Sequence, residues 1–127
     1  MTNNKQIEFG ADSVVWSFVA SANVTSGQVV QIDGGKVKPV TAASQHVFGV
    51  ALIPASIGKP VSVIMEGIVK VQTTGVGNAT AGDLFGGGAG GYAAKRTWSQ
   101  LNERRLDLGV AIENITRNAK GKIKLLW

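Results

Sequence analysis

The sequence predicts an all-β protein, a small β-barrel or sandwich built from two internally duplicated β-units with an extended N-terminal arm. Three observations support this class. Glycine supplies 17 of the 127 residues, which is about twice its usual share, and β-branched residues dominate the apolar segments between the glycines. No long segment has helical periodicity, and the chain repeats its own motifs.

Ten short segments have the composition expected of strands joined by tight turns. In residues 122–125 (KIKL) polar and apolar side chains alternate, as on a strand with one wet face, and residues 33–35 (DGG) form a good hairpin turn. One short helix is expected at 98–105, after a segment that resembles a capping box. The ten expected strands are 14–20, 29–32, 36–40, 47–52, 61–65, 68–72, 83–85, 92–95, 106–112 and 122–127.

The internal repeat is the strongest single feature. Residues 23–30 (NVTSGQVV) match residues 78–85 (NATAGDLF) at an offset of 55. Further on, residues 48–52 (FGVAL) match residues 108–112 (LGVAI) at an offset of 60, because the loops of the second copy are longer. Each copy therefore contains the same succession of turns, hairpin and strands.

These matches divide the chain into a duplicated β-domain, residues 23–127, and an N-terminal stretch, residues 1–22. The two units span about 23–72 and 78–127, and neither can close alone, so we expect them to pack together. Within this domain either Val50 and Val110 or their neighbours Ala51 and Ala111 should be core residues, because side chains alternate along a strand.

The N-terminal stretch has no counterpart in the second copy. It either supplies an extra strand or forms an arm that adds to a neighbouring subunit's sheet, and different parts can do each. Its anchor-type residues Ile7, Phe9, Trp16 and Phe18 are candidates for subunit or partner contacts. Trp127 should dock against the domain or across a subunit boundary, and so much apolar surface favours an oligomer.

Composition sets the broad class of the chain. Hydrophobic residues make up 44% and charged residues 17%, which is too apolar for disorder, and no apolar run approaches the roughly 18 residues of a membrane span. The chain has no cysteine, which excludes disulfides and thiolate metal sites. Residues 1–5 lack the apolar core of a signal peptide, so we expect a soluble protein made in the cytoplasm.

The net charge of +5 arises entirely in residues 95–127, where eight cations face three acids. A basic loop with Lys95, Arg96, Arg104 and Arg105 flanks Trp98, and such a loop offers cations for phosphate and a ring for base stacking. A nucleic-acid-binding β-barrel is therefore the alternative function. The same charges are also explained by solvent-exposed loops and by an edge strand that lysines protect from pairing. We favour this interpretation over nucleic-acid binding because the first copy is neutral and aromatic residues total only 6%.

Catalytic and cofactor motifs are missing from the sequence. His46 is the only histidine, no nucleophile elbow accompanies it, and the eight acids are scattered singly. Residues 86–91 (GGGAGG) satisfy the dinucleotide-binding glycine pattern, but a strand follows them in place of the required long helix. We therefore expect no enzymatic activity, no cofactor, no metal and no small-molecule substrate.

The ordered motifs resemble the small capsid decoration, or cement, proteins of tailed bacteriophages. The resemblance rests on residues 24–30 (VTSGQVV), 48–52 (FGVAL), 55–63 (ASIGKPVSV), 66–69 (EGIV) and the second copy, and spans roughly residues 22–127. Two features depart from it: Gln28 stands where these proteins commonly have an acid, and the segment 96–105 is longer and more basic than usual.

This resemblance implies a structural protein on the virion exterior, assembled in the host cytoplasm. Its partners would be the major capsid protein and itself, as a homotrimer at local three-fold positions. The resemblance also implies that the protein has no catalytic activity, and the N-terminal anchor residues then become candidate capsid contacts.

Overall fold

The computed structural model describes residues 13–42, 45–73, 79–96, 107–116 and 119–125. Each of the ten predicted strands overlaps an observed one, and the predicted helix at 98–105 lies outside the described residues. A 3-10 turn, η1 (Ala89–Gly91), is the one helical element in the described ranges. The strands are β1 (Val14–Val19), β2 (Val29–Asp33), β3 (Lys36–Pro39), β4 (Gly49–Ala51), β5 (Pro60–Glu66), β6 (Ile68–Gln72), β7 (Leu84–Gly87), β8 (Ala93–Arg96), β9 (Asp107–Ala111) and β10 (Lys120–Leu125).

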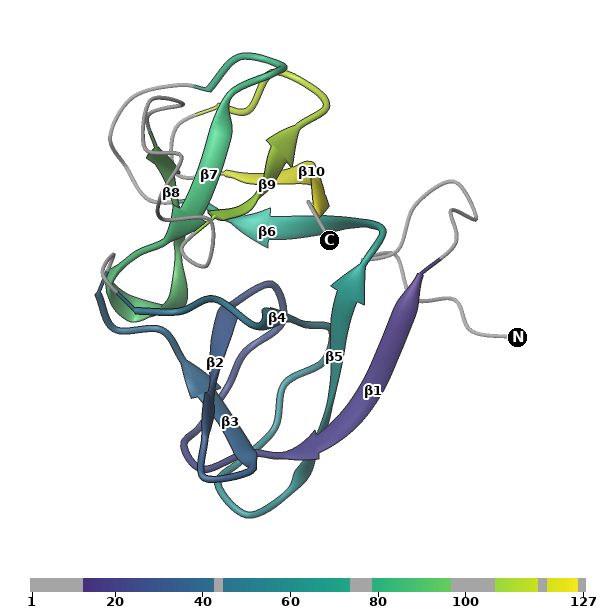
Figure 1. Ribbon diagram of the computed structural model, residues 1–127, viewed down its shortest axis with the longest axis vertical. Helices are drawn as coiled ribbons and strands as arrows, with labels where there is room; N and C mark the ends of the chain where they lie inside the picture. Colours follow the sequence, from purple (N-terminus) through teal and green to yellow (C-terminus); the bar gives the residue numbers. More distant parts are fainter. Residues whose placement is uncertain (1–12, 43–44, 74–78, 97–106, 117–118, 126–127) are drawn as a thin grey trace.

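The strands form two five-stranded antiparallel sheets (Figure 1). The first sheet has the order β1-β5-β4-β2-β3 and the second has β6-β10-β9-β7-β8, so adding five to each label of the first order gives the second. Neither sheet closes into a barrel, which corrects the barrel alternative. In each sheet the two edge strands approach at a single parallel bridge, Ala20 to Val37 in the first and Thr73 to Ala93 in the second, in place of a continuous ladder.

The sheet boundary lies between β5 and β6. Strand β6 pairs with β10 and so belongs to the second sheet, although the sequence repeat placed residues 68–72 in the first unit. Residues Val14–Val19 form β1, which pairs with β5 at the edge of the first sheet. In strand order, β1 therefore occupies in the first sheet the position that β6 occupies in the second.

The central strand β4 of the first sheet is buried on both faces. Val50 is fully buried in a hydrophobic cluster that both sheets contribute to, whereas Ala51 is fully buried in a second cluster formed by the first sheet alone. Ala111 of the second sheet is buried as well. The expected core positions at the repeated Gly-Val-Ala motif are thus confirmed, and the shared cluster joins the two sheets.

The glycine-rich segment forms part of the junction between the sheets. A side chain at Gly87 would meet Val40 and Val47, which lie in the connection between β3 and β4, at 2.9 and 3.2 Å. Gly91 has a φ of +77°, and its N–H donates to the Val40 carbonyl at 2.7 Å. Strand β8 follows directly, so the predicted hairpin is confirmed, and its glycines allow close approach of two backbones. Within the described ranges, no helix is long and apolar enough to cross a membrane.

Candidate interaction surface

The described part of the basic segment belongs to the scaffold. Lys95 and Arg96 lie in β8, and Arg104 and Arg105 lie outside the described residues. The Arg96 guanidinium Nε is 2.8 Å from Asp107 Oδ1, and the two side chains are only 9% and 11% exposed. Because it is buried in an ion pair, Arg96 is not presented to a phosphate at the surface. The sequence singled out Arg96 as part of a basic loop but did not indicate that Asp107 is its partner.

Lys95 lies on the surface beside a turn. Its Nζ is 3.4 Å from Asp83 Oδ2, and both side chains are partly exposed. The Thr80 backbone N–H donates to the same carboxylate at 2.8 Å, and this hydrogen bond, with a smaller contribution from Lys95, lowers the pKa of Asp83 below its ordinary value. Asp83 therefore stays ionised and fixes the turn that begins the second repeat.

Gln28 occupies the matching position in the first repeat and makes a corresponding contact. Its Oε1 accepts from the Thr25 N–H at 2.8 Å, as the Asp83 carboxylate accepts from Thr80. In addition, Gln28 Nε2 donates to the carbonyl of Gly90, which lies in η1 between β7 and β8 of the second sheet, at 2.8 Å. A carboxylate could accept the first bond but could not donate the second. The departure from the expected acid thus gives a hydrogen bond between the sheets.

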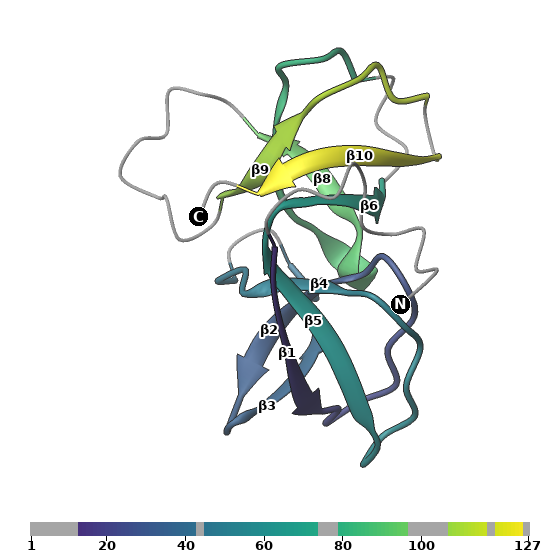
Figure 2. The ribbon, with the colours of Figure 1, turned by 90° about the vertical axis from the view of Figure 1, so that its right-hand side faces the viewer.

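Strand β1 carries the exposed apolar surface that the sequence indicated. It lies at the outside of the first sheet beside β5 (Figures 1 and 2). Trp16 is 62% exposed, and its neighbours Val15 and Val19 are also exposed. The predicted contact residues Ile7, Phe9 and Trp127 lie outside the described residues.

Phe18 has a supporting position in this strand. Its ring meets Phe48 edge to face, with centroids 5.2 Å apart and an interplanar angle of 86°. Both rings pack on the cluster of the first sheet, so they tie β1 to the segment that precedes β4. The aromatic content of the N-terminal stretch identified Phe18, but nothing in the sequence indicated Phe48 as its partner.

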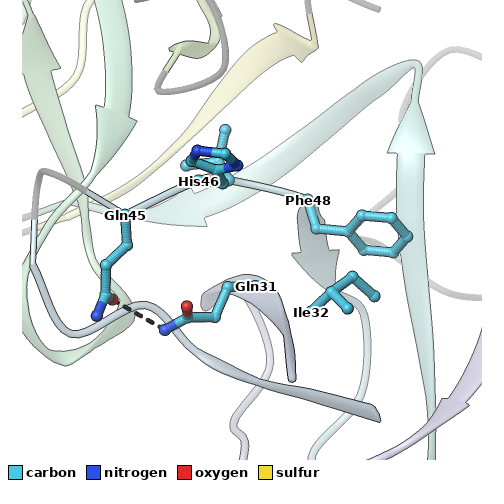
Figure 3. A pocket seen from close by; sticks show the side chains of 6 residues that line it. Gln31, Ile32, Gln45, His46 and Phe48 are labelled. Atoms are coloured by element: carbon cyan, nitrogen blue, oxygen red, sulfur yellow. Dashed lines mark hydrogen bonds between the residues drawn. The ribbon is translucent and has the colours of Figure 1, made fainter. Parts of the chain in front are cut away.

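A surface pocket of about 460 Å³ lies next to Phe48 (Figure 3). Gln31 Nε2 donates to Gln45 Oε1 at 2.8 Å at one end, and Ile32 and Phe48 line the other. His46 is exposed on its rim. The lining residues carry neither a carboxylate nor a hydroxyl group, so they include no partner for histidine catalysis. Across the described ranges, no three His, Cys, Asp or Glu side chains gather as a metal site would require.

Comparisons with known proteins give a consistent result. A family model described as phage cement protein matches residues 7–126. No curated protein matches the chain. Among solved structures, the chain is similar to the head fiber gp8.5 N base of bacteriophage phi29, with 17% sequence identity and a TM-score of 0.66 over 90% of this chain and 94% of that chain. At that identity the likeness supports the fold alone.

Proposed function

Because the chain belongs to the phage cement protein family, we propose that it binds the outside of the major capsid protein shell and stabilises the virion. The observation that carries this proposal is the family match, which covers residues 7–126 and so includes both sheets. The family and the fold are those of structural phage proteins, and the pocket beside Phe48 offers no catalytic pair.

Stabilisation follows from linkage between binding and assembly. A protein that binds assembled capsid subunits better than free ones adds its binding free energy to the cost of dissociating the shell. Several modest contacts repeated around a symmetry axis give high avidity even when each contact is weak. We place the protein on the shell as a homotrimer at local three-fold positions, because one contact can then be repeated three times.

The scaffold suits a purely mechanical role. Two sheets joined by a shared core, the Gln28 hydrogen bond and the close approach at Gly87 hold their surfaces in a fixed relation. A rigid binder loses little conformational entropy when it attaches, so more of the contact free energy appears as affinity. We assign capsid contact to Ile7 and Phe9 of the N-terminal arm. We expect the ring of Trp127 to hold the end of the chain against the domain or a neighbouring subunit.

We also interpret the two sheets as a tandem duplication. Their strand orders correspond, and equivalent backbone bonds recur: the Gly27 N–H donates to the Ala51 carbonyl, and the Gly82 N–H donates to the Ala111 carbonyl. On this interpretation the units run from β1 to β5 and from β6 to β10. The interpretation predicts that the β1–β5 unit superposes on the β6–β10 unit strand for strand, and a superposition that pairs other strands would contradict it.

Binding to purified shells tests the proposed function. The full chain should co-sediment with empty, nucleic-acid-free capsids of its phage, and a variant lacking residues 2–12 should remain folded by circular dichroism but bind more weakly. Undiminished binding of the truncated variant would contradict the arm assignment. Failure of the full chain to bind shells, together with retention on DNA that falls steeply with salt, would instead support the nucleic-acid alternative.

A further inference from the structure

The edge strands of the two sheets differ in how they are protected. An exposed sheet edge pairs readily with another strand, and proteins prevent this with lysine, other charges or proline on the edge. Three of the four edge strands carry such residues: β3 has two lysines and a proline, β6 has a lysine, and β8 has a lysine and an arginine. Strand β1 reads VVWSFV and carries neither a charge nor a proline.

The backbone of β1 leaves a short stretch of this edge open. The Ala20 N–H donates to the Lys59 carbonyl at 2.9 Å, so Ala20 directs its backbone groups to the chain that leads into β5. Along an antiparallel ladder every second residue does the same. Phe18 and Trp16, two and four residues earlier, therefore direct their backbone N–H and C=O groups to β5. Val15 and Ser17 then direct theirs away from β5. Beyond Val19 the edge is closed, because the Ser21 N–H donates to the Val37 carbonyl. Within the described residues, no strand pairs with the outer edge of β1.

We propose that the free edge of β1 pairs antiparallel with β1 of a second copy of this chain, on a two-fold axis that passes beside Trp16. In this register Val15 of one copy lies opposite Ser17 of the other, and all the outward backbone groups of these two residues are satisfied. Trp16 lies opposite its own copy as a non-hydrogen-bonded pair, where side chains approach most closely. The two indoles, each 62% exposed in the single chain, then cover one another.

Charge selects a second copy as the occupant. When a strand pairs with its own copy on a two-fold axis, each side chain lies opposite the same residue of the other copy or a residue close to it in sequence. A strand with several charges of one sign therefore brings like charges together. Self-pairing of β3 would bring Lys36 and Lys38 together, and self-pairing of β8 would do the same for Lys95 and Arg96. Among the four edge strands, β1 is the one without a charged side chain, so its self-pairing avoids this repulsion in every register.

The pairing adds a second kind of contact to the proposed trimer. A two-fold contact cannot close a ring of three, so it joins chains that belong to neighbouring trimers. On a shell, local two-fold axes lie between local three-fold positions, and the contact would connect the trimers into a network. The inference itself does not depend on capsid binding, since the pairing can be measured with the isolated chain.

Sedimentation equilibrium of the full chain over a range of concentrations tests the pairing. The weight-average mass of the wild type should rise with concentration to at least twice that of Trp16→Lys, whether the unpaired species is a monomer or a trimer. In the variant lysine opposes lysine at the axis, so the dissociation constant of the pairing should rise at least about tenfold. Ile57→Lys is the matched control, since Ile57 is 64% exposed but lies outside β1. It should associate as the wild type does. Equal association of Trp16→Lys and wild type, or a wild-type chain that shows no pairing at about 1 mM, would overturn the proposal.

A cysteine variant tests the register directly. The chain has no native cysteine, and a non-hydrogen-bonded antiparallel pair brings Cα atoms to about 4.5 Å, within the range of a disulfide. Trp16→Cys should therefore form a covalent dimer under mild oxidation at concentrations where Ile57→Cys does not. Equal cross-linking of the two variants would contradict the register. Hydrogen exchange adds a check: if the Val15 and Ser17 amides are protected in a dilute, unpaired sample, the edge is covered within one chain and the proposal fails.

Discussion

Replacing Arg96 by leucine should destabilise the protein strongly, because the change leaves the Asp107 carboxylate buried without its cation. The two groups are 2.8 Å apart, and their side chains are 9% and 11% exposed. Removing one partner of such a buried pair costs about 3–5 kcal/mol. The free energy of unfolding of a domain is only about 5–15 kcal/mol, so this single change removes a large part of it.

The melting temperature converts this cost into an observable shift. For a chain of this size, 1 kcal/mol corresponds to about 3–5 °C, so Arg96→Leu should melt about 10–20 °C below the wild type. Lys95→Leu is the matched control on the same strand. Its ion pair with Asp83 is 3.4 Å long and the side chains are 46% and 32% exposed. Solvent screens such a pair to at most about 1 kcal/mol, so the shift should stay below about 5 °C.

Thermal and urea unfolding, followed by circular dichroism, would measure both variants. The double variant Arg96→Leu, Asp107→Leu should recover most of the lost stability, because no uncompensated charge then remains buried. The reasoning would be refuted if Arg96→Leu and Lys95→Leu were equally stable, or if the double variant were no more stable than Arg96→Leu alone.

Three further predictions concern the turns and the strand contacts. Gln28→Glu should lower the free energy of unfolding by about 1–2 kcal/mol at neutral pH in a urea titration, because a carboxylate cannot donate to the Gly90 carbonyl; an unchanged midpoint would argue against that hydrogen bond. The pKa of Asp83 is lowered from 3.8 by the Thr80 N–H, so its contribution to stability is present above pH 3.8 and lost as the pH falls through the lower pKa of the folded state. The stability difference between wild type and Asp83→Asn should therefore shrink below pH 3.8, and a constant difference would contradict this sign. Gly49→Ala places a methyl carbon 2.5 Å from a carbonyl oxygen of β5. This clash should lower the free energy of unfolding by about 1–3 kcal/mol in the same urea titration. An unchanged free energy of unfolding would mean that β4 and β5 can move apart without strain.

Strands with one solvent-facing side could be predicted from sequence because their side chains alternate between core and solvent. In β10, for example, Ile123 and Leu125 are buried and Lys124 between them is exposed. The turns were equally clear, since Gly27, Gly34 and Gly82 all adopt positive φ. Local patterns of this kind depend on neighbouring residues, and those are visible in the sequence.

Contacts across the fold could not be predicted in this way. Arg96 and Asp107 come together because β8 and β9 flank β7, and a list of charges does not reveal that arrangement. The repeat comparison missed the correspondence between β1 and β6, because VVWSFV and IVKVQ share no glycine or turn motif that would align them. The amide of Gln28 reaches Gly90, 62 residues away, and only the packing of the two sheets explains it.

A three-dimensional cryo-EM reconstruction of the virion tests the central claim of capsid attachment most directly. The account predicts density for the two five-stranded sheets on the outer surface of the shell, in contact with the major capsid protein and repeated three times around local three-fold axes. Particles that contain the protein but show this density inside the shell, on the packaged DNA or nowhere on the capsid exterior would contradict it.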